Sequence, residues 1–466
     1  MENEKLPIKF FAPREVDELR IEGNKNSEKP KWVLRGKELK QRADSLRLSL
    51  DSLETKFSMR KSSPVPFSFI VKLQSDATAK SKREDITNLF EQKSFGGVVG
   101  LTDTNKLIVA LDSLEELKEV ANRINDYEIN DYAISCIEDF EEFVPYIVKG
   151  KKECNYKIKL VDYQNYEQNL AMRRRLEHTL NKEGIDYTKT DYSEEYYIYK
   201  LRNITEKSLD VLKKADIFNA LFSIEPMPKY KVSLDCLKSD NNIPIKKPDD
   251  EKMYITIGIL DNGIANIPHL SPWMEMDRWS PYPKTSINPT HGTFVSGIAL
   301  YGDECEGKIW VDHKGLKIFD AAVFPDVTKE GLDEDELIAN IKDVIRLYHE
   351  KVKIWNLSIS ITREVIDTKF SDFAIALDSI QDEYNVLICK SAGNCENFTV
   401  SRPKGRIHEG ADSVRSLVVR SVAHKKGKYD YAEVNDPSPF SRVGPGPEYI
   451  IKPEVSHYAL HLCPLP

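Results

Sequence analysis

The second half of the chain contains four short apolar runs that lack strict alternation of polar and apolar residues. They are YITIGILD, LKIFDAAVFPD, VKIWNLSIS and YNVLICKSAGN, and helix-like segments such as DEDELIANIKDVIRLYHE separate them. Strands that are apolar at almost every position are covered on both faces, which is typical of a parallel sheet packed between helices. We therefore expect residues 253–466 to form an α/β domain around a parallel sheet.

The first half follows another pattern, in which strand-like and helix-like segments repeat in the order β-α-β-β-α. Residues 64–150 and 151–235 each contain one such unit, which favours two ferredoxin-like α+β modules. Residues 1–63 are polar and include one amphipathic helix. The leucines on its expected apolar face are Leu39, Leu46, Leu50 and Leu53. Residues 236–252 are polar, carry two prolines and are expected to form a linker.

Composition excludes several classes of protein. The net charge of −8 provides no general positive field for nucleic acid or an anionic membrane. No run of about 18 apolar residues, the length that spans a bilayer, occurs in the chain. The opening MENEKLPIKFFAPREVDELR is charged where a secretion signal needs an apolar core, which predicts a cytoplasmic protein. The seven cysteines form no Cys-x-x-Cys pair, so we expect reduced, buried thiols and no zinc site.

Three polar residues occupy positions where α/β proteins place their sites. Asp261 ends the first apolar run before Asn262-Gly263, although Asp before Gly is also ordinary turn chemistry. His291 opens the helix-like segment HGTFVSGIAL, and Asn394 follows the last apolar run, where a simple Gly-Asn turn is the alternative. Small residues after the histidine should allow that helix to pack closely, namely Gly292, Ser296, Gly297 and Ala299.

These motifs, taken in order, resemble those of the subtilisin-like serine peptidases, family S8. The matching motifs are Asp-x-Gly after a strand, His-Gly-Thr at a helix start and Ser-Ala-Gly-Asn after a later strand. NLSIS looks like the strand whose edge receives the substrate backbone, SPFSRVGPG looks like the Phe-Ser-x-x-Gly-Pro segment, and IKPEV looks like the strand that precedes the nucleophile. The resemblance covers roughly residues 250–460, and the long N-terminal region suggests the intracellular bacterial branch.

The resemblance implies a role for each matched residue. His291 would take the proton of the attacking hydroxyl, and Asp261 would fix the imidazole tautomer and stabilise its cation. Asn394 would donate a hydrogen bond to the oxyanion, which in subtilisin is worth about 3 to 4 kcal/mol. The resemblance requires no metal and no organic cofactor. A substrate peptide would add as a strand beside Asn356, Leu357, Ser358, Ile359 and Ser360.

The family's nucleophile segment, Gly-Thr-Ser-x-Ala, has no match in this sequence. None of the serines beyond Asn394 follows Gly-Thr or opens a small-residue helix; they are Ser401, Ser413, Ser416, Ser421, Ser438, Ser441 and Ser456. ALHLCPLP, residues 459–466, stands where the domain should continue, and its two prolines disfavour a helix. We expect a frameshift, premature end or gene-boundary error, with a genuine short form as the alternative. Losing the serine costs about 10⁶ in turnover, so we expect no useful hydrolysis.

Two functions stay open. One is an intracellular endopeptidase with a truncated sequence, and the other is a pseudoenzyme or peptide-binding module that keeps the groove. A nucleotide-binding protein is disfavoured because no Gly-x-Gly-x-x-Gly or Gly-Lys-Ser/Thr loop occurs. Secreted relatives carry a ferredoxin-like prodomain whose tail lies in the cleft, and FNALFSIEPMPKYKV is similar to such an end. Some intracellular relatives are encoded beside an AAA-type ATPase, a candidate partner alongside protein or peptide substrates.

Overall fold

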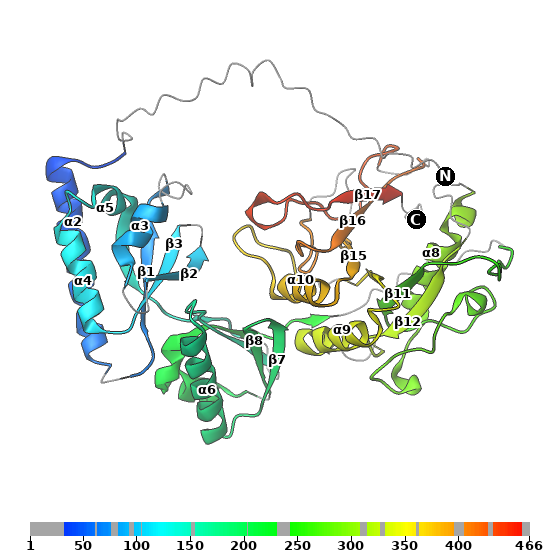
Figure 1. Cartoon of the computed structure of the whole chain (residues 1–466), viewed down its shortest axis with the longest axis horizontal. Coiled ribbons are helices and arrows are strands. Elements are labelled where there is room, and N and C mark those ends of the chain that lie inside the picture. Colours follow the sequence, from blue (N-terminus) through cyan, green and yellow to red (C-terminus); the bar gives the residue numbers. More distant parts are fainter. Residues whose placement is uncertain are drawn as a thin grey trace, which may run out of the picture. The chain divides into compact units, whose positions relative to one another are not determined.

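The computed structural model describes most of the chain. The described residues are 32–60, 63–75, 83–92, 97–103, 105–150, 154–202, 204–230, 243–307, 315–326, 331–359, 363–395, 405–426 and 432–458. The charged N-terminal segment and ALHLCPLP, two stretches used in the sequence predictions, lie outside these residues. The chain divides into two compact units, Met1–Phe143 and Val144–Pro466 (Figure 1).

The first unit contains an antiparallel sheet of four strands in the order β2-β3-β1-β4. The strands are β1 (Phe67–Leu73), β2 (Gly97–Asp103), β3 (Lys106–Leu111) and β4 (Ile137–Glu142). The helices are α2 (Gly36–Ser58), α3 (Arg83–Phe90), α4 (Leu114–Asn125) and α5 (Asp131–Cys136). The element order and the central β1 match a ferredoxin-like module, as predicted.

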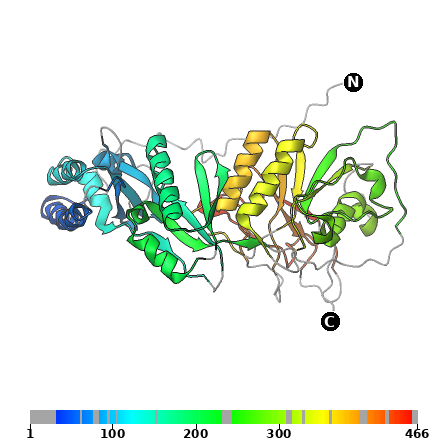
Figure 2. The same cartoon turned by 90° about the horizontal axis from the view of Figure 1, so that it is seen from below.

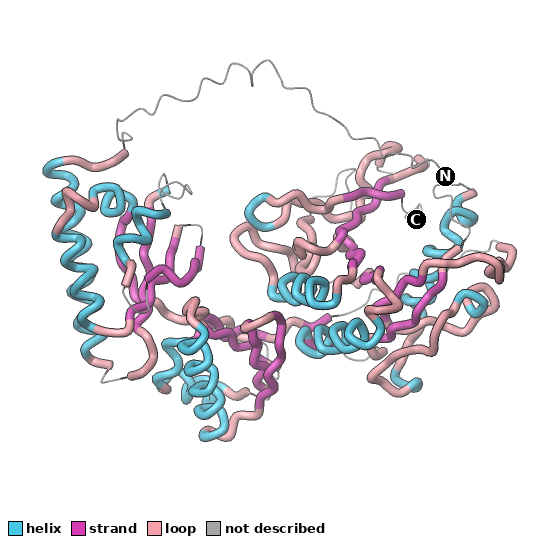
Figure 3. Tube along the Cα trace, in the orientation of Figure 1, coloured by secondary structure: helices cyan, strands magenta, loops and turns pink. Residues whose placement is uncertain are grey.

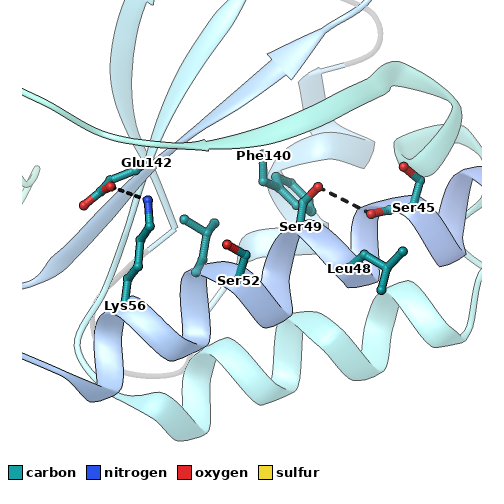
Figure 4. Close-up of a pocket in the computed structure, with 8 residues that line it drawn as sticks. Ser45, Leu48, Ser49, Ser52, Lys56, Phe140 and Glu142 are labelled. Atoms are coloured by element: carbon teal, nitrogen blue, oxygen red, sulfur yellow. Dashed lines mark hydrogen bonds and ion pairs between the residues drawn. The ribbon is translucent and has the colours of Figure 1, made fainter.

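Helix α2 confirms the amphipathic pattern. All four predicted leucines are buried in the core cluster that also contains Phe67 and Phe69 of β1. At the edge of this core, between α2 and β4, a groove of about 380 Å³ is lined by serines of the helix and by Phe140 and Glu142 of β4 (Figure 4). Lys56 Nζ lies 2.6 Å from Glu142 Oε2 at one end of this groove. None of the residues predicted for catalysis belongs to this unit.

The second unit begins with a sheet of five strands in the order β5-β9-β6-β8-β7. The strands are β5 (Tyr146–Ile147), β6 (Tyr156–Leu160), β7 (Tyr187–Ser193), β8 (Tyr196–Leu201) and β9 (Leu221–Pro226), with helices α6 (Tyr166–Lys182) and α7 (Glu206–Lys214). Four of these strands repeat the ferredoxin-like order. β5 falls within the residues predicted for the first module, but it pairs in parallel with β9 and extends the second sheet.

The rest of the second unit is built on a six-stranded parallel sheet (Figure 3). The strands, in sheet order, are β12 (Lys317–Ala322), β11 (Thr256–Asp261), β14 (Ile354–Leu357), β15 (Leu387–Ser391), β16 (Leu417–Val422) and β17 (Val455–Tyr458). Every neighbouring pair is parallel. This arrangement confirms the predicted α/β class and explains why the strands are apolar on both faces.

Helices cover both faces of the parallel sheet. They are α8 (Thr290–Glu306), α9 (Glu334–Tyr348) and α10 (Asp372–Tyr384). Ile259 of β11 packs in one apolar cluster with Leu300 of α8. The next residue, Leu260, belongs to another cluster with Leu337 of α9 and Leu377 of α10. Because successive strand residues point to opposite faces, α8 covers one face and α9 and α10 cover the other.

The second ferredoxin-like module packs on α9 and α10 (Figure 2). Short strand β10 (Lys229–Tyr230) follows β9 and pairs antiparallel with β13 (Leu332–Asp333), which leads into α9. Lys157 of β6 lies 2.5 Å from Glu334, the first residue of α9, and also pairs with Asp372, the first residue of α10. The module and the parallel-sheet domain therefore form one packed body joined by buried charges.

Residues 243–246, part of the predicted linker over 236–252, are anchored beside α8. Lys246 Nζ donates to the Leu300 carbonyl at 2.6 Å, and Trp273 Nε1 donates to the Lys246 carbonyl at 3.1 Å. The Ile243 carbonyl lies 2.9 Å from His269 Nε2. The prolines prevent regular secondary structure here. The neighbouring residues can still pack through apolar side chains and backbone hydrogen bonds, and Ile243 packs on the apolar cluster beneath α8.

Candidate active site

Asp261 and His291 meet at the carboxyl edge of the parallel sheet. Asp261 is the last residue of β11 and is fully buried, and His291 is the second residue of α8. The imidazole Nδ1 lies 2.9 Å from Asp261 Oδ1 and 2.8 Å from Oδ2. A carboxylate only accepts hydrogen bonds, so Nδ1 carries the proton and Nε2 is left as the basic nitrogen. This is the orientation that a general base requires.

Close backbone approach makes this contact possible. A Cβ on Gly292 would lie 2.3 Å from the Gly263 carbonyl oxygen, so a side chain here would push α8 away from the turn. Gly263 has φ of +98°, a left-handed conformation that favours glycine. The Asn262 side chain adds a direct link, because its Oδ1 accepts the Gly292 N–H at 3.0 Å. The strand-to-helix turn thus fixes His291 relative to Asp261.

The four small residues expected beneath the histidine differ in how much they contribute to the packing of α8 on the sheet. Gly292 and Ser296 are buried, and Ser296 Oγ donates to the Gly292 carbonyl at 2.7 Å. A Cβ on Gly297 would have no neighbour within 4 Å, and Ala299 is half-buried. The prediction that Gly297 is needed for packing is therefore wrong, because that position turns away from the sheet.

A second buried carboxylate supports the turn. Asp320 of β12 accepts the Ile264 N–H at 3.0 Å and pairs with Arg278 Nε at 2.6 Å. Burial raises the pKa of Asp320, Arg278 and the Ile264 N–H oppose that rise, and the Asp261 charge adds to it. Arg278 also donates to the Ile264 carbonyl. Sequence reasoning missed Asp320, Arg278 and Asn262; for Asn262 the Asp-Asn-Gly turn itself was an available signal.

Asn394 lies at the same sheet edge, beyond the end of β15. β14 separates β11 from β15, so the strand that ends at Asp261 and the strand that leads to Asn394 are two strand spacings apart, roughly 10 Å. The Asn394 carbonyl accepts Arg442 Nε at 2.9 Å, and its backbone bridges to Ser441, which leaves an exposed side chain on an anchored backbone. Within the described residues Asn394 makes no direct contact with His291.

The predicted peptide-binding segment divides into two parts. Asn356 is paired on both sides, with Ile259 of β11 and Cys389 of β15, so its backbone cannot receive a peptide. Leu357 ends β14 and still pairs with β15. The prediction of a free edge is wrong at Asn356, because β14 is an interior strand. Ser358 and Ile359 follow the strand end, whereas Ser360 lies outside the described residues.

Three of the described serines beyond Asn394 form side-chain hydrogen bonds away from His291. Ser413 Oγ donates to Asp378 at 2.5 Å, Ser441 Oγ accepts the Ser421 N–H at 3.2 Å, and Ser456 Oγ accepts Arg420 Nε at 2.7 Å. Among the residues that the structure describes, no serine hydroxyl hydrogen-bonds to His291. Ser401 falls outside them.

One group of three carboxylates in the described ranges has the spacing of a cation site. Oxygens of Asp333, Asp335 and Glu336 lie within 4.8 Å of one another. Lys200 Nζ lies between them, at 3.4, 3.0 and 2.7 Å respectively. The chain's own ammonium group thus lies where a cation would bind and offsets one of the three negative charges.

The parallel-sheet domain corresponds to a known family. Residues 253–464 match the family model of the subtilases, peptidase family S8. This part of the chain is a subtilase domain. The match includes Asp261, His291 and Asn394, and it begins after the second ferredoxin-like module ends. No curated protein matches the chain.

Two solved structures show limited similarity. The MycP3 protease from the type VII (ESX-3) secretion system is 14% identical over 42% of this chain and 57% of its own, with a TM-score of 0.26. A phospho-2-dehydro-3-deoxyheptonate aldolase from Thermotoga maritima is 10% identical over 61% of this chain and 74% of its own, with a TM-score of 0.14. Both scores are low, so the family assignment stands on the sequence match. Across the described helices, none combines the length and apolar character of a membrane span.

Proposed function

We propose that the subtilase domain carries the Asp-His part of a serine-type endopeptidase site that acts on protein substrates. The observation that carries this proposal is the contact between His291 Nδ1 and both Asp261 oxygens. His291 Nε2 would accept the proton of an attacking hydroxyl, and Asp261 would stabilise the imidazolium that forms. Asn394 would donate to the oxyanion that develops on the substrate carbonyl.

The second ferredoxin-like module would act as a prodomain-like block. Its tail strand β10 already adds to β13 by backbone pairing, which is how a peptide would be held in an extended conformation. Tyr230 is fully buried, its ring centroid lies 4.9 Å from that of Phe373, and its hydroxyl lies 3.4 Å from Glu334. The tail thus occupies a surface of the subtilase domain that suits a peptide side chain.

The 466 residues contain no Gly-Thr-Ser segment, so we expect this chain to bind peptides without hydrolysing them. In subtilisin, losing the serine alone costs about 8 kcal/mol of barrier. The second candidate, a pseudoenzyme that keeps the groove, is favoured by the same absence. Cytoplasmic location and delivery of substrates by an AAA-type ATPase are further parts of the proposal, supported by the family resemblance.

Two measurements test these proposals. Proton NMR of the full chain should show a far-downfield Nδ1–H resonance of His291 that disappears in Asp261→Asn, because the amide can no longer hold the same tautomer. Its absence from the wild-type spectrum would contradict the Asp-His site. Reading the gene beyond the codon for Ala459 in all three frames separates the two candidates: a Gly-Thr-Ser-x-Ala segment supports the peptidase, and an intact stop supports the pseudoenzyme.

A further inference from the structure

Lys390 is a buried lysine in the centre of the subtilase sheet. It lies on β15, four residues before Asn394, and is 1% exposed. Burying an ammonium group is costly unless the group is paired, so lysine is rarely found in such a place. Among the described residues no carboxylate forms an ion pair with it. Other contacts of the ammonium group must therefore offset the cost of burying it.

The Lys390 ammonium is surrounded by three oxygen acceptors. Its Nζ lies 2.5 Å from the Ile359 carbonyl, 3.0 Å from the Ser391 carbonyl and 3.3 Å from Ser391 Oγ. An ammonium group has three N–H bonds, which match these three acceptors. The side chain thus replaces an ion pair with hydrogen bonds to neutral groups.

These hydrogen bonds join two segments that meet at the candidate active site. Ile359 lies two residues beyond β14, in the part of the predicted peptide-binding segment that the sheet does not pair. Ser391 ends β15 and begins the turn to Asn394. The Ile359 side chain also belongs to the apolar cluster that contains Tyr230 of the docked tail. A change at Lys390 therefore reaches both the peptide-binding segment and the candidate oxyanion turn.

We propose that Lys390 is a positioning residue, whose Nζ holds the peptide-binding segment at Ile359 against the turn that carries Asn394. The hold is complete when Lys390 is an ammonium group and incomplete when it is an amine, because an amine has two N–H bonds for three acceptors. The consequence for substrate binding rests on the proposed peptidase function, whereas the hold on Ile359 does not depend on it.

The titration of this hold falls in the physiological range. Burial lowers the pKa of Lys390 to about 7, and the Asp412 carboxylate opposes that shift. Asp412 itself accepts hydrogen bonds from Ser371 and from the Gly410 N–H. Burial, Arg442 and Lys390 lower the pKa of neighbouring His408 to about 3, so its imidazole is neutral and does not titrate with the lysine. The hold should weaken as pH rises through about 7.

Global stability should move in the opposite direction. The lysine's pKa is lower in the folded chain than in the unfolded chain, where it is near 10.5. The unfolded state therefore binds more protons between these two values, and the contribution of Lys390 to the free energy of unfolding rises with pH in that interval. A purely structural lysine would change stability in this way without loosening one segment.

Hydrogen exchange of the full chain, followed by mass spectrometry, tests the proposal. Three proteins are compared: wild type, Lys390→Met, which cannot donate, and Lys390→Arg, which stays charged at every pH used. At pH 6 we expect Ser358 and Ile359 to exchange at least tenfold faster in Lys390→Met than in wild type, with β16 unchanged. After correction for intrinsic rates, wild-type protection of this segment should fall between pH 6 and 8, whereas that of Lys390→Arg should not.

Equal exchange in wild type and Lys390→Met, or wild-type protection that does not change with pH, would overturn the proposal. If Lys390→Met does not fold, the pH profiles of wild type and Lys390→Arg still decide it. A labelled MPKYKVSL peptide, residues 227–234, is then added to the Tyr230→Ala chain, whose own tail is weakened. If hydrogen exchange at Ser358 and Ile359 changes as expected but the peptide does not bind, the role of Lys390 is supported and the proposed peptide-binding function is contradicted.

Discussion

Replacing Lys157 by methionine measures how strongly buried charges hold the second module to the subtilase domain. Methionine keeps an unbranched apolar side chain and removes the charge. The Lys157 side chain is 3% exposed and pairs with Glu334 and Asp372, which are 1% and 12% exposed. Removing one partner of a buried ion pair costs about 3 to 5 kcal/mol. Lys159 stays 3.3 Å from Asp372, so we expect a loss near the lower end, about 3 kcal/mol.

This loss should depend on pH. Burial alone would raise the pKa of Asp372, but Lys157 and Lys159 hold it well below its usual range. In wild type the Asp372 carboxylate thus contributes stability above about pH 4, the pKa of an unfolded aspartate, and the contribution is lost as pH falls further. In the variant, burial without the Lys157 charge favours protonation of Asp372. The difference between variant and wild type should be largest near pH 7 to 8 and shrink toward pH 4 to 5.

Urea unfolding of the full chain, followed by tryptophan fluorescence, gives the free energies. Trp273 and Trp355 are fully buried in the second unit and report its unfolding. Lys189→Met is the matched control, because Lys189 pairs with Glu177 at 3.0 Å on the surface and should contribute less than about 1 kcal/mol. A Lys157→Met loss no larger than that of the control, or one that grows toward low pH, would refute the reasoning.

Three further substitutions test separate parts of the structure. Gly292→Ala should destabilise the chain by about 2 kcal/mol and abolish the proton resonance of the His291–Asp261 hydrogen bond. Gly297→Ala is the control and should do neither, because the space around its Cβ is open. An unchanged resonance in Gly292→Ala would contradict the close approach of α8 to the turn. Tyr230→Ala removes a fully buried aromatic side chain and should lower the free energy of unfolding, measured by thermal unfolding, by about 3 to 5 kcal/mol. A loss below about 1 kcal/mol would show that β10 does not pack on the subtilase domain. Ser113→Ala removes the N-cap of α4 and should cost about 1 kcal/mol by urea unfolding, restored by Ser113→Asp; equal stability of all three would contradict the cap.

Periodicity and turn chemistry predicted much of the fold. The apolar runs around Asp261 and Asn394 became interior strands of a parallel sheet, because a two-sided sheet leaves no polar face. The contact between Asp261 and His291 follows from the placement of a strand end and a helix start at one edge. Their separation of 30 residues in sequence conceals how close they lie.

Other features depended on partners that a local pattern does not reveal. The four leucines of α2 were predictable from spacing, but the burial of Lys157 and Lys390 was not, because lysine in a strand usually marks a solvated face. The interior position of Asn356 depends on strands from both sides. The docking of Ile243 likewise depends on a helix that follows it by more than forty residues in the sequence.

The anchoring of Ile243 and Lys246 beside α8 has a consequence for any competitor of the docked tail. Tyr230 and Ile243 are fixed at the two ends of residues 231–242, a stretch of twelve residues. A tail released from β13 would remain tethered, and a short tether gives an effective concentration on the order of millimolar. A peptide in solution with equal intrinsic affinity would therefore need to reach that concentration to displace half of the tail. Substrate entry at lower concentrations would require tighter binding, cleavage of the tether or mechanical removal of the module.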